Sequence, residues 1–158
     1  MPMRAVETRL GRMVLESSAI GLRRWGWSDE HCEPSDCPHL NSAAVWLQGY
    51  FDAVPMPEPA LDRRSMTPFA VAVCEVLALI APPGTTTTYG EVAAAVGRPM
   101  AQRAVGAVMA RNPLPLLVPC HRVLPSAGGI GAYSAAEGAR TKLWLLEHER
   151  RTRNGVDG

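Results

Sequence analysis

The chain has 158 residues, of which 47% are hydrophobic and 20% are charged, and its formal net charge is +1. This length suits one ordinary domain or two small lobes. The sequence contains no run of about 18 apolar residues, which excludes a membrane-spanning helix, and its first residues lack the apolar core of a signal peptide. We therefore expect a cytoplasmic protein, and its four cysteines do not require a disulfide framework.

The small net charge is unevenly divided along the chain. Residues 1–66 carry seven Arg against nine Asp and Glu, whereas residues 67–158 carry nine Arg and Lys against six Asp and Glu. A polyanionic partner is therefore expected to meet the C-terminal part.

The first third of the chain predicts a small sheet. Residues 4–8 and 12–18 are expected to form short strands around Gly11, and a third strand is expected from Ile20 to Trp27. Residues 28–40 are polar and contain two prolines, which is typical of a loop.

One helix and a linker complete the N-terminal half. Asn41 or Ser42 can cap a helix that ends near Phe51. The prolines that follow predict a stiff, extended segment. We therefore divide the chain into an N-terminal scaffold lobe, a linker and a C-terminal lobe, at residues 1–53, 54–66 and 67–158.

The C-terminal lobe is predicted to begin with a buried helix. Thr67 is suited to cap this helix and Pro68 to occupy its first turn. The helix runs to Ile80 and is apolar on almost every side, so we expect it to lie at the centre of the lobe, with Cys74 in the core.

A helix-turn-helix is predicted next. Thr88 and Glu91 match a capping box that opens a helix through Ala95, and a second helix is expected from Met100 to Arg111 after a glycine turn. This pattern alone is also typical of other helical hairpins.

The second helix of this pair has an unusual outer face. Val105 and Val108 can face the core. The opposite face carries mainly small side chains: Gln102, Arg103, Gly106, Ala107 and Ala110. Such a face can approach a nucleic-acid backbone closely, and it would equally suit packing against the other lobe.

A final amphipathic helix is predicted over residues 137–151, with Leu143, Trp144 and Leu146 directed inward. Arginines near its end complement the negative pole of the helix. Together these elements predict a mixed α/β (α+β) protein, made of a small antiparallel sheet-plus-helix lobe and a helical, winged-helix-like lobe with a helix-turn-helix.

The segment Pro119-Cys120-His121-Arg122-Val123 lies between an apolar run and a glycine-rich segment. A cysteine is a nucleophile only as its thiolate, which a neighbouring base or cation favours, and here a histidine follows it directly. Cys120 is therefore a candidate nucleophile. The alternative interpretation is a buried structural cysteine.

A helix-turn-helix followed by Pro-Cys-His-Arg-Val resembles the O6-alkylguanine-DNA alkyltransferases, also called methylated-DNA–protein-cysteine methyltransferases. The likeness covers roughly residues 67–150, whereas residues 1–66 resemble the family only in outline. The segments that carry it are Thr88-Tyr89-Gly90-Glu91-Val92, Arg103-Ala104-Val105-Gly106, Asn112-Pro113, Pro119–Val123, Gly131-Ala132-Tyr133-Ser134 and Trp144-Leu145-Leu146 with Glu149.

The resemblance implies DNA repair by direct reversal, an irreversible and one-time transfer of an alkyl group, typically methyl, to Cys120. The donor atom is implied to be O6 of guanine, and also O4 of thymine. His121 is implied to act as base through a water, and Glu149 to fix the imidazole. Asn112 is implied to brace the turn around the cysteine, and Tyr89 to donate a hydrogen bond or proton to the leaving base.

The resemblance also implies a double-stranded DNA partner, a monomeric protein and no cofactor. The target base must leave the stack, and Arg103 is implied to fill the gap. The other implied DNA contacts are Gln102, Gly106, Ala107 and Arg111. The implied substrate pocket consists of Met109, Val123, Gly131, Tyr133 and Ser134. The loop after Ser134 is longer than the family pattern, which leaves the size of the pocket open.

A second group of reactive residues lies in the N-terminal part: His31, Cys32, Cys37 and His39. Two Cys and two His can bind zinc, although this spacing matches no standard finger. A Cys32–Cys37 disulfide and two free thiols are the alternatives. We expect no metal, with a structural zinc on these four residues as the alternative.

Two other classes of protein compete with the alkyltransferase. A DNA-binding module without chemistry would not need Cys120, His121 and Glu149 together. A cysteine hydrolase needs a distant histidine and an oxyanion hole, and neither His39 nor His148 has that context.

Overall fold

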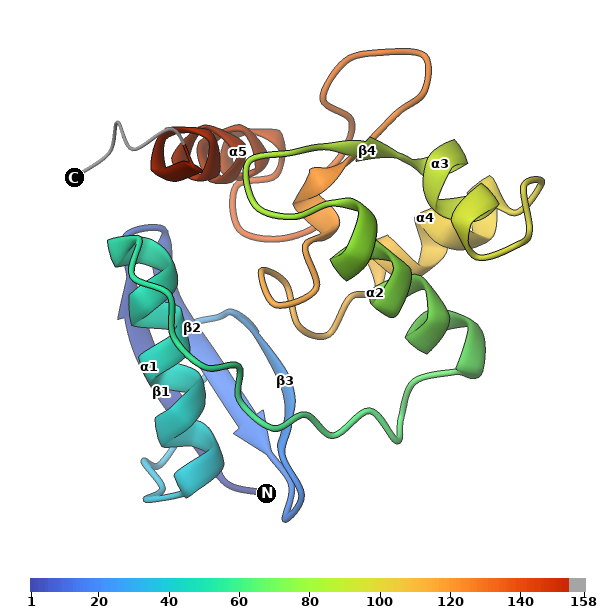
Figure 1. The fold of residues 1–158 in the computed structure, drawn as a ribbon. Coiled ribbons are helices and arrows are strands. Elements are labelled where there is room, and N and C mark those ends of the chain that lie inside the picture. The colour runs from blue at the N-terminus through green and yellow to red at the C-terminus, as the bar shows by residue number, and fades with distance from the viewer. Residues whose placement is uncertain (154–158) are drawn as a thin grey trace. The chain divides into compact units, whose positions relative to one another are not determined.

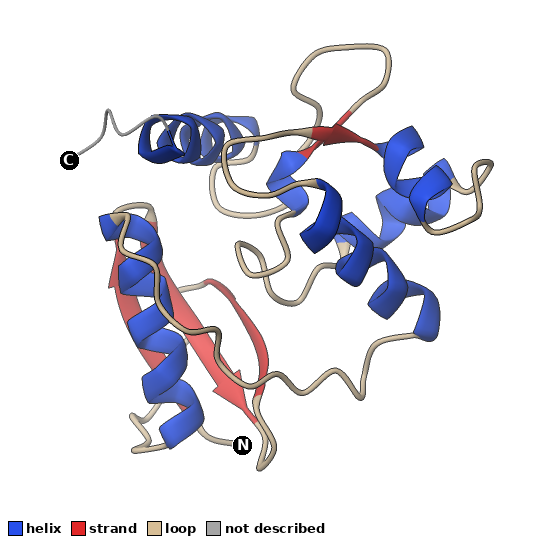
Figure 2. Ribbon diagram, viewed as in Figure 1, coloured by secondary structure: helices blue, strands red, loops and turns tan. Residues whose placement is uncertain are grey.

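The computed structural model describes residues 1–153, and the chain divides into two compact units, Met1–Ser65 and Met66–Gly158. The first unit contains β1 (Met3–Thr8), β2 (Gly11–Ser17), β3 (Leu22–Trp27) and α1 (Pro38–Asp52). The second contains α2 (Pro68–Ile80), β4 (Thr87–Thr88), α3 (Tyr89–Ala95), α4 (Gln102–Ala110), the 3-10 turn η1 (Cys120–Arg122), β5 (Val123–Leu124) and α5 (Ala139–Arg153). These elements, drawn in Figures 1 and 2, confirm the predicted mixed α/β class. No described helix combines the length and the apolar character that a membrane crossing requires.

In the first unit, the three strands form an antiparallel sheet in the order β1-β2-β3, and α1 packs against it (Figure 2). Met13 and Leu15 are two residues apart on β2, so they face the same side of the sheet, and both are fully buried. Leu40 and Leu47 of α1 are also fully buried. The predicted strands therefore supply one apolar face to a small core.

Helix α1 begins at Pro38, earlier than predicted. Cys37 is its N-cap residue and Pro38 occupies the first turn, where its fixed φ is favourable. Asn41, the proposed cap, lies inside the helix, where its side chain accepts a hydrogen bond from Arg4 at 2.7 Å and donates one to Asp36 at 3.1 Å. The polar composition of residues 28–40 predicts a loop, and this prediction is wrong for Pro38, because a proline is also favourable at the start of a helix.

The predicted linker is partly paired with the first unit. The Leu22 amide donates to the Ala60 carbonyl at 2.8 Å, and the Asp62 amide donates to the Leu22 carbonyl at 2.8 Å. Gly21 permits this approach, because a Cβ at that position would lie 2.6 Å from the Ala60 oxygen. The segment is extended as predicted, and an extended chain can pair with an open strand edge.

Helix α2 is capped as predicted but is not buried on every side. The Thr67 hydroxyl accepts a hydrogen bond from the Ala70 amide at 3.1 Å. Val73 and Leu77 are fully buried, whereas Leu79 is 82% exposed. The expectation of a wholly central helix is therefore wrong for the last turn, because a uniformly apolar helix does not indicate which side faces the core.

Helices α3 and α4 form the predicted helix-turn-helix. The Thr88 hydroxyl accepts a hydrogen bond from the Glu91 amide at 3.1 Å, which is one half of the capping box. The Glu91 carboxylate accepts its bond from the Thr87 hydroxyl at 2.7 Å instead. This contact joins the start of α3 to β4.

The inward face of α5 differs from the prediction. Leu145 is fully buried and Leu143 is 54% exposed. Lys142, His148 and Glu149 also face inward. The apolar pattern placed the wrong stripe because this helix buries polar groups, which hydrophobic periodicity does not detect.

Candidate active site

Cys120 begins η1, directly after a tight buried turn. The Val118 amide donates to the Leu114 carbonyl at 2.9 Å to close this turn, and Leu116 within it has a φ of 81°. A non-glycine residue in this region costs conformational energy that the surrounding packing must offset. The turn therefore holds Cys120 in a fixed and largely buried position, with 8% of its surface exposed.

Asn112 spans the same turn with its side-chain amide. Its Nδ2 donates to the Val118 carbonyl at 2.8 Å, and its Oδ1 accepts from the Leu114 amide at 2.9 Å. Both ends of the turn are thereby tied to one side chain. This is the geometry that the predicted bracing role requires.

A cavity of about 160 Å³ opens beside Cys120. Strand β5 follows η1 and pairs in parallel with β4, so that Thr87 lies opposite Val123. Because β4 leads directly into α3, Tyr89 at the start of α3 is brought close to the cysteine. The residues that line the cavity are Tyr89, Gly106, Met109, Ala110, Cys120, Ala132, Tyr133 and Ser134.

Three of the five predicted pocket residues, Met109, Tyr133 and Ser134, line this cavity. The Ser134 hydroxyl donates to the Ala110 carbonyl at 3.2 Å, which ties the loop to α4. The Tyr133 hydroxyl is buried and has no hydrogen-bond partner within the described chain. An unpaired buried hydroxyl beside a cavity is available to a ligand.

The other two predicted pocket residues do not line the cavity. Val123 is fully buried in β5. Gly131 has a φ of +75°, and a Cβ there would lie 2.9 Å from the Pro125 ring. Gly131 is therefore required by the turn, and the sequence pattern could not separate this requirement from contact with a substrate.

We expect Gly131→Ala to destabilise the protein more than Gly129→Ala. Both glycines have a positive φ, which costs an alanine about 1–2 kcal/mol. A Cβ at Gly129 would meet nothing within 4 Å, whereas at Gly131 it meets the Pro125 ring. Urea unfolding of both variants measures the difference. Equal losses would show that the ring contact is relieved without cost.

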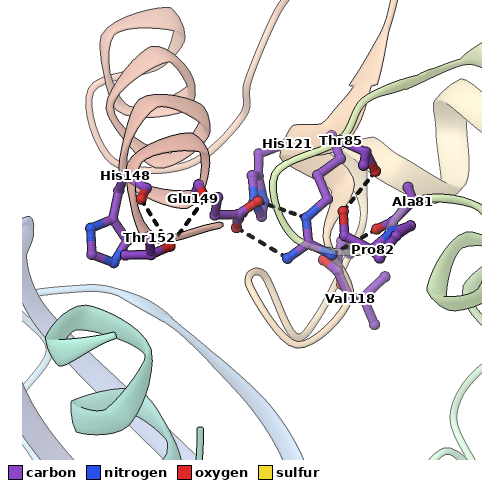
Figure 3. A network of polar contacts seen from close by, with 10 residues as sticks. Ala81, Pro82, Thr85, Val118, His121, His148, Glu149 and Thr152 are labelled. Carbon is purple, nitrogen blue, oxygen red and sulfur yellow. Dashed lines mark hydrogen bonds and ion pairs between the residues drawn. The ribbon is translucent and has the colours of Figure 1, made fainter. Parts of the chain in front are cut away.

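The carboxylate of Glu149 joins α5 to η1 in a buried polar network (Figure 3). His121 Nε2 lies 2.6 Å from Glu149 Oε2. Arg122 donates to both oxygens of the same carboxylate, at 2.7 and 3.1 Å, and to the Ala81 carbonyl at 2.8 Å. The sequence motif contains Arg122, but its role as a second partner of Glu149 was not predicted.

The network determines which nitrogen of His121 is free. Burial alone would raise the pKa of Glu149, but the bonds and charges of His121 and Arg122 outweigh burial and hold this pKa well below its usual range. An ionised carboxylate accepts hydrogen bonds only, so Nε2 carries the proton. Nδ1 is buried and has no protein partner within the described residues. Burial lowers the pKa of His121, so the ring is neutral and its Nδ1 is a base.

The groups around the Cys120 sulfur shift the pKa of its thiol in opposite directions. Burial raises the pKa of the Cys120 thiol, while a hydrogen bond from Asn112 and the positive charge of Lys142 lower it. Lys142 lies fully buried on α5. It was not predicted as a site residue, because lysines are rarely buried and no local pattern marks an exception.

Comparisons with known proteins identify the family of this chain. The family model described as "6-O-methylguanine DNA methyltransferase, DNA binding domain" matches residues 68–151. The chain is 33% identical to the methylated-DNA–protein-cysteine methyltransferase of Mus musculus, over 91% of this chain and 79% of that protein. The chain belongs to the methylated-DNA–protein-cysteine methyltransferase family.

Two further members support the assignment. The constitutive methylated-DNA–protein-cysteine methyltransferase of Bacillus subtilis is 32% identical, over 91% of this chain and 92% of that protein. The crystal structure of Mycobacterium tuberculosis OGT in complex with DNA superposes with a TM-score of 0.82 at 30% identity, covering 96% of this chain and 94% of that one. The family resemblance inferred from the motifs is therefore confirmed.

The methyltransferase-family residues predicted to contact DNA lie on or beside α4. Gln102, Arg103 and Ala107 are exposed, and so is Arg111 at the end of the helix. Gly106 is half-buried. Gly106 and Ala110 of this outer face also line the cavity beside Cys120.

The Cys/His group of the first unit is not assembled as a metal site. The side chains have separate partners: Arg12 for Cys32, Ser17 for Cys37, Glu33 for His31 and the Ala19 carbonyl for His39. In residues 1–153, no three or more His, Cys, Asp or Glu side chains are placed to hold a metal. Cys32 and Cys37 are free thiols, so the disulfide alternative is wrong.

Proposed function

We propose that this protein repairs alkylated DNA by transferring the alkyl group, typically methyl, from O6 of guanine to Cys120, and from O4 of thymine as a second substrate. The observation that carries the proposal is the position of Cys120. Its thiol lines a cavity between Tyr89 and Tyr133, and the next residue belongs to a buried His–Glu pair. Double-stranded DNA is the partner, and each monomer carries one acceptor.

The reaction needs a soft nucleophile that attacks a saturated carbon, and a thiolate is suited to this. The sulfur forms a bond to the alkyl carbon while the bond from that carbon to oxygen breaks. The electron pair leaves with the guanine, and the Tyr89 hydroxyl stabilises this negative charge by a hydrogen bond, or takes the charge over as a tyrosinate by donating its proton. No cofactor takes part. Because a thioether does not return to a thiol, each molecule reacts once.

The proton of Cys120 goes to His121. Nδ1 is the free base of the ring, and a bridging water carries the proton because adjacent side chains rarely bond directly. The resulting imidazolium is stabilised by the Glu149 carboxylate at 2.6 Å. Asn112 keeps the cysteine turn in place during the reaction.

The experiment that tests the proposal is intact-mass measurement after mixing with duplex DNA that contains O6-methylguanine. One added methyl group per chain is expected, located by peptide mapping on Cys120. The Cys120→Ser variant should stay unmodified. Repeated turnover would indicate a different enzyme, binding without label would indicate a DNA-binding module, and a label on Cys74 would refute the assignment of the acceptor.

The exposed arginine of α4 supplies a second test. A base inside a duplex must be flipped out before it reaches the cavity, and Arg103 is the residue proposed to fill the gap, with Gln102, Gly106, Ala107 and Arg111 beside the backbone. Arg103→Ala is expected to slow repair of duplex DNA far more than the reaction with free benzylguanine, which needs no flipping.

A matched control for this variant is Arg140→Ala. Arg140 is an exposed arginine that pairs with Glu137 at the start of α5. It should leave both reactions near the parent rates. Equal losses of Arg103→Ala on the two substrates would contradict a role in flipping.

A further inference from the structure

Met100 stands at the tip of the turn between α3 and α4. With 94% of its surface exposed, it is more exposed than any other large apolar side chain of the described residues. The Ala101 amide donates to the Arg98 carbonyl at 2.9 Å, which places Pro99 and Met100 at the two central positions of a closed turn. This turn extends beyond the ends of both helices (Figure 1), so the Met100 side chain projects into solvent.

The turn that carries Met100 is fixed to its surroundings. The Arg98 amide donates to the Ala93 carbonyl at 3.0 Å, which ties the turn to the end of α3. The Arg98 guanidinium lies 5.4 Å from the centre of the Phe69 ring, and this cation–π contact joins the turn to the start of α2. Met100 is therefore presented at one place on the surface, and a preorganised side chain loses less entropy when it binds a partner.

The exposed arginines near this turn differ from those of α5. On α5, exposed arginines pair with glutamates of the same helix or of the turn before it: Arg140, Arg150 and Arg151. Around α4, exposed arginines form no ion pair within residues 1–153: Arg98, Arg103 and Arg111. Positive charges without acidic partners complement a polyanion, so the surface on both sides of Met100 is suited to phosphate groups.

Met100 cannot lie far from a DNA strand that α4 contacts. It precedes Gln102 by two residues, and two residues of chain span at most about 7 Å. After Gln102 and Arg103, the exposed face of α4 carries only small side chains, which allow the helix to approach a strand closely. A strand that touches these two residues is therefore within reach of the methionine side chain.

We propose that Met100 packs against the deoxyribose rings and base edges of the bound duplex and forms an apolar part of the DNA interface. This inference rests on the proposed function, because it takes duplex DNA as the ligand of α4. A methionine is flexible and polarisable, so it adapts to an irregular surface, and apolar side chains are used in this way by proteins that deform DNA.

The apolar contact has a consequence for the salt dependence of binding. Contacts between arginine and phosphate release counterions and weaken as the salt concentration rises. Burial of an apolar side chain releases no counterion. Met100 should therefore add a contribution to DNA affinity that is the same at every salt concentration, whereas the neighbouring arginines supply the part that salt removes.

The test measures the affinity of the full chain for an unmodified DNA duplex over a range of salt concentrations. Met100→Gln replaces the apolar end of the side chain by a polar group. We expect it to bind about tenfold more weakly at every salt concentration, with the parent slope of log affinity against log salt. Met100→Lys should instead steepen this slope by about 0.9, the value for one added phosphate contact. Equal affinities of Met100→Gln and the parent would overturn the proposal.

Leu79→Gln is the matched control. Leu79 is 82% exposed and lies in the last turn of α2. Phe69, which contacts the turn of Met100, lies ten residues earlier in the same helix, or about 15 Å along its axis. Leu79→Gln should keep the parent affinity and slope. A loss equal to that of Met100→Gln would refute a contact specific to Met100.

Oxidation of methionine gives a second measurement on the unaltered chain. Hydrogen peroxide converts exposed methionines to sulfoxides, and peptide mapping follows each of them. Met1 is 67% exposed and serves as the reference within the same sample. Saturating duplex should slow the oxidation of Met100 several-fold relative to Met1. A ratio of the two rates that DNA does not change would count against the proposed contact.

Neither measurement involves alkyl transfer, so the two proposals can be separated. If the parent binds the duplex and Met100→Gln binds it equally well, the contact of Met100 is refuted and the proposed function is untouched. If the parent does not bind duplex DNA at any salt concentration, the proposed function is refuted together with this contact.

Discussion

Arg122→Met is expected to lower the free energy of unfolding by about 3–5 kcal/mol at neutral pH, the usual cost of leaving a buried charge without its partner. The guanidinium makes two hydrogen bonds to a carboxylate that is 3% exposed. It also satisfies the Ala81 carbonyl at the end of α2. Methionine would fill the space but remove both of the arginine's hydrogen bonds to the buried Glu149 carboxylate. Urea unfolding measures the loss.

Arg150→Met is the control for this experiment. Arg150 pairs with Glu147 on the exposed side of α5, and exposed pairs of this kind contribute little to stability. The expected change is therefore small. If the free energy of unfolding fell equally in both variants, burial of the Arg122–Glu149 pair would not explain the loss in Arg122→Met.

The pH dependence of unfolding gives a further check on the network. The pKa of His121 is lowered by burial in the folded protein, so its contribution to stability is lost as pH falls below about 6.5. The pKa of Glu149 is also held below its ordinary value, so its contribution is lost below about 4.3. The charge of Arg122 also lowers the pKa of His121. The loss of stability below about pH 6.5 should therefore be smaller in Arg122→Met than in the parent.

Local signals in the sequence predicted much of the fold. Thr67 with Pro68, and Thr88 with Glu91, mark helix starts through bonds to residues three positions away. Pro38 also marks a helix start, but it stands in a polar segment whose composition predicts a loop. The burial of a helix face depends on distant elements, and so the apolar pattern failed at Leu143 of α5.

The candidate site was predictable only as far as its motifs extend. The proximity of His121 to Glu149 was expected from the family resemblance, and the structure places these side chains in contact. Arg122 and Lys142 gain their importance from burial and from partners in other elements, which no spacing reveals. Gly131 shows the reverse case, where a residue in a recognisable motif serves the turn and does not line the cavity.

Glu149→Gln is expected to slow alkyl transfer to Cys120 at neutral pH by about a hundredfold, the lower range for loss of general acid–base catalysis. A glutamine can still bond to His121, but it provides no negative charge to stabilise the imidazolium. The thiol then keeps its proton at neutral pH, because the pKa of a free thiol is about 8.5. The loss should shrink as pH rises and Cys120 ionises without the base.

DNA affinity should change little in Glu149→Gln, because a side chain that is 3% exposed cannot reach a phosphate. The variant also removes the anion from Arg122, so its stability is measured separately and the rates are taken where unfolding is negligible. A purely structural defect would lower the amount of active protein equally at every pH, whereas loss of the base changes the slope of rate against pH. If Glu149→Gln reacts at the parent rate at neutral pH, the carboxylate serves only to hold α5 to Arg122, and the proton transfer through His121 proposed here is wrong.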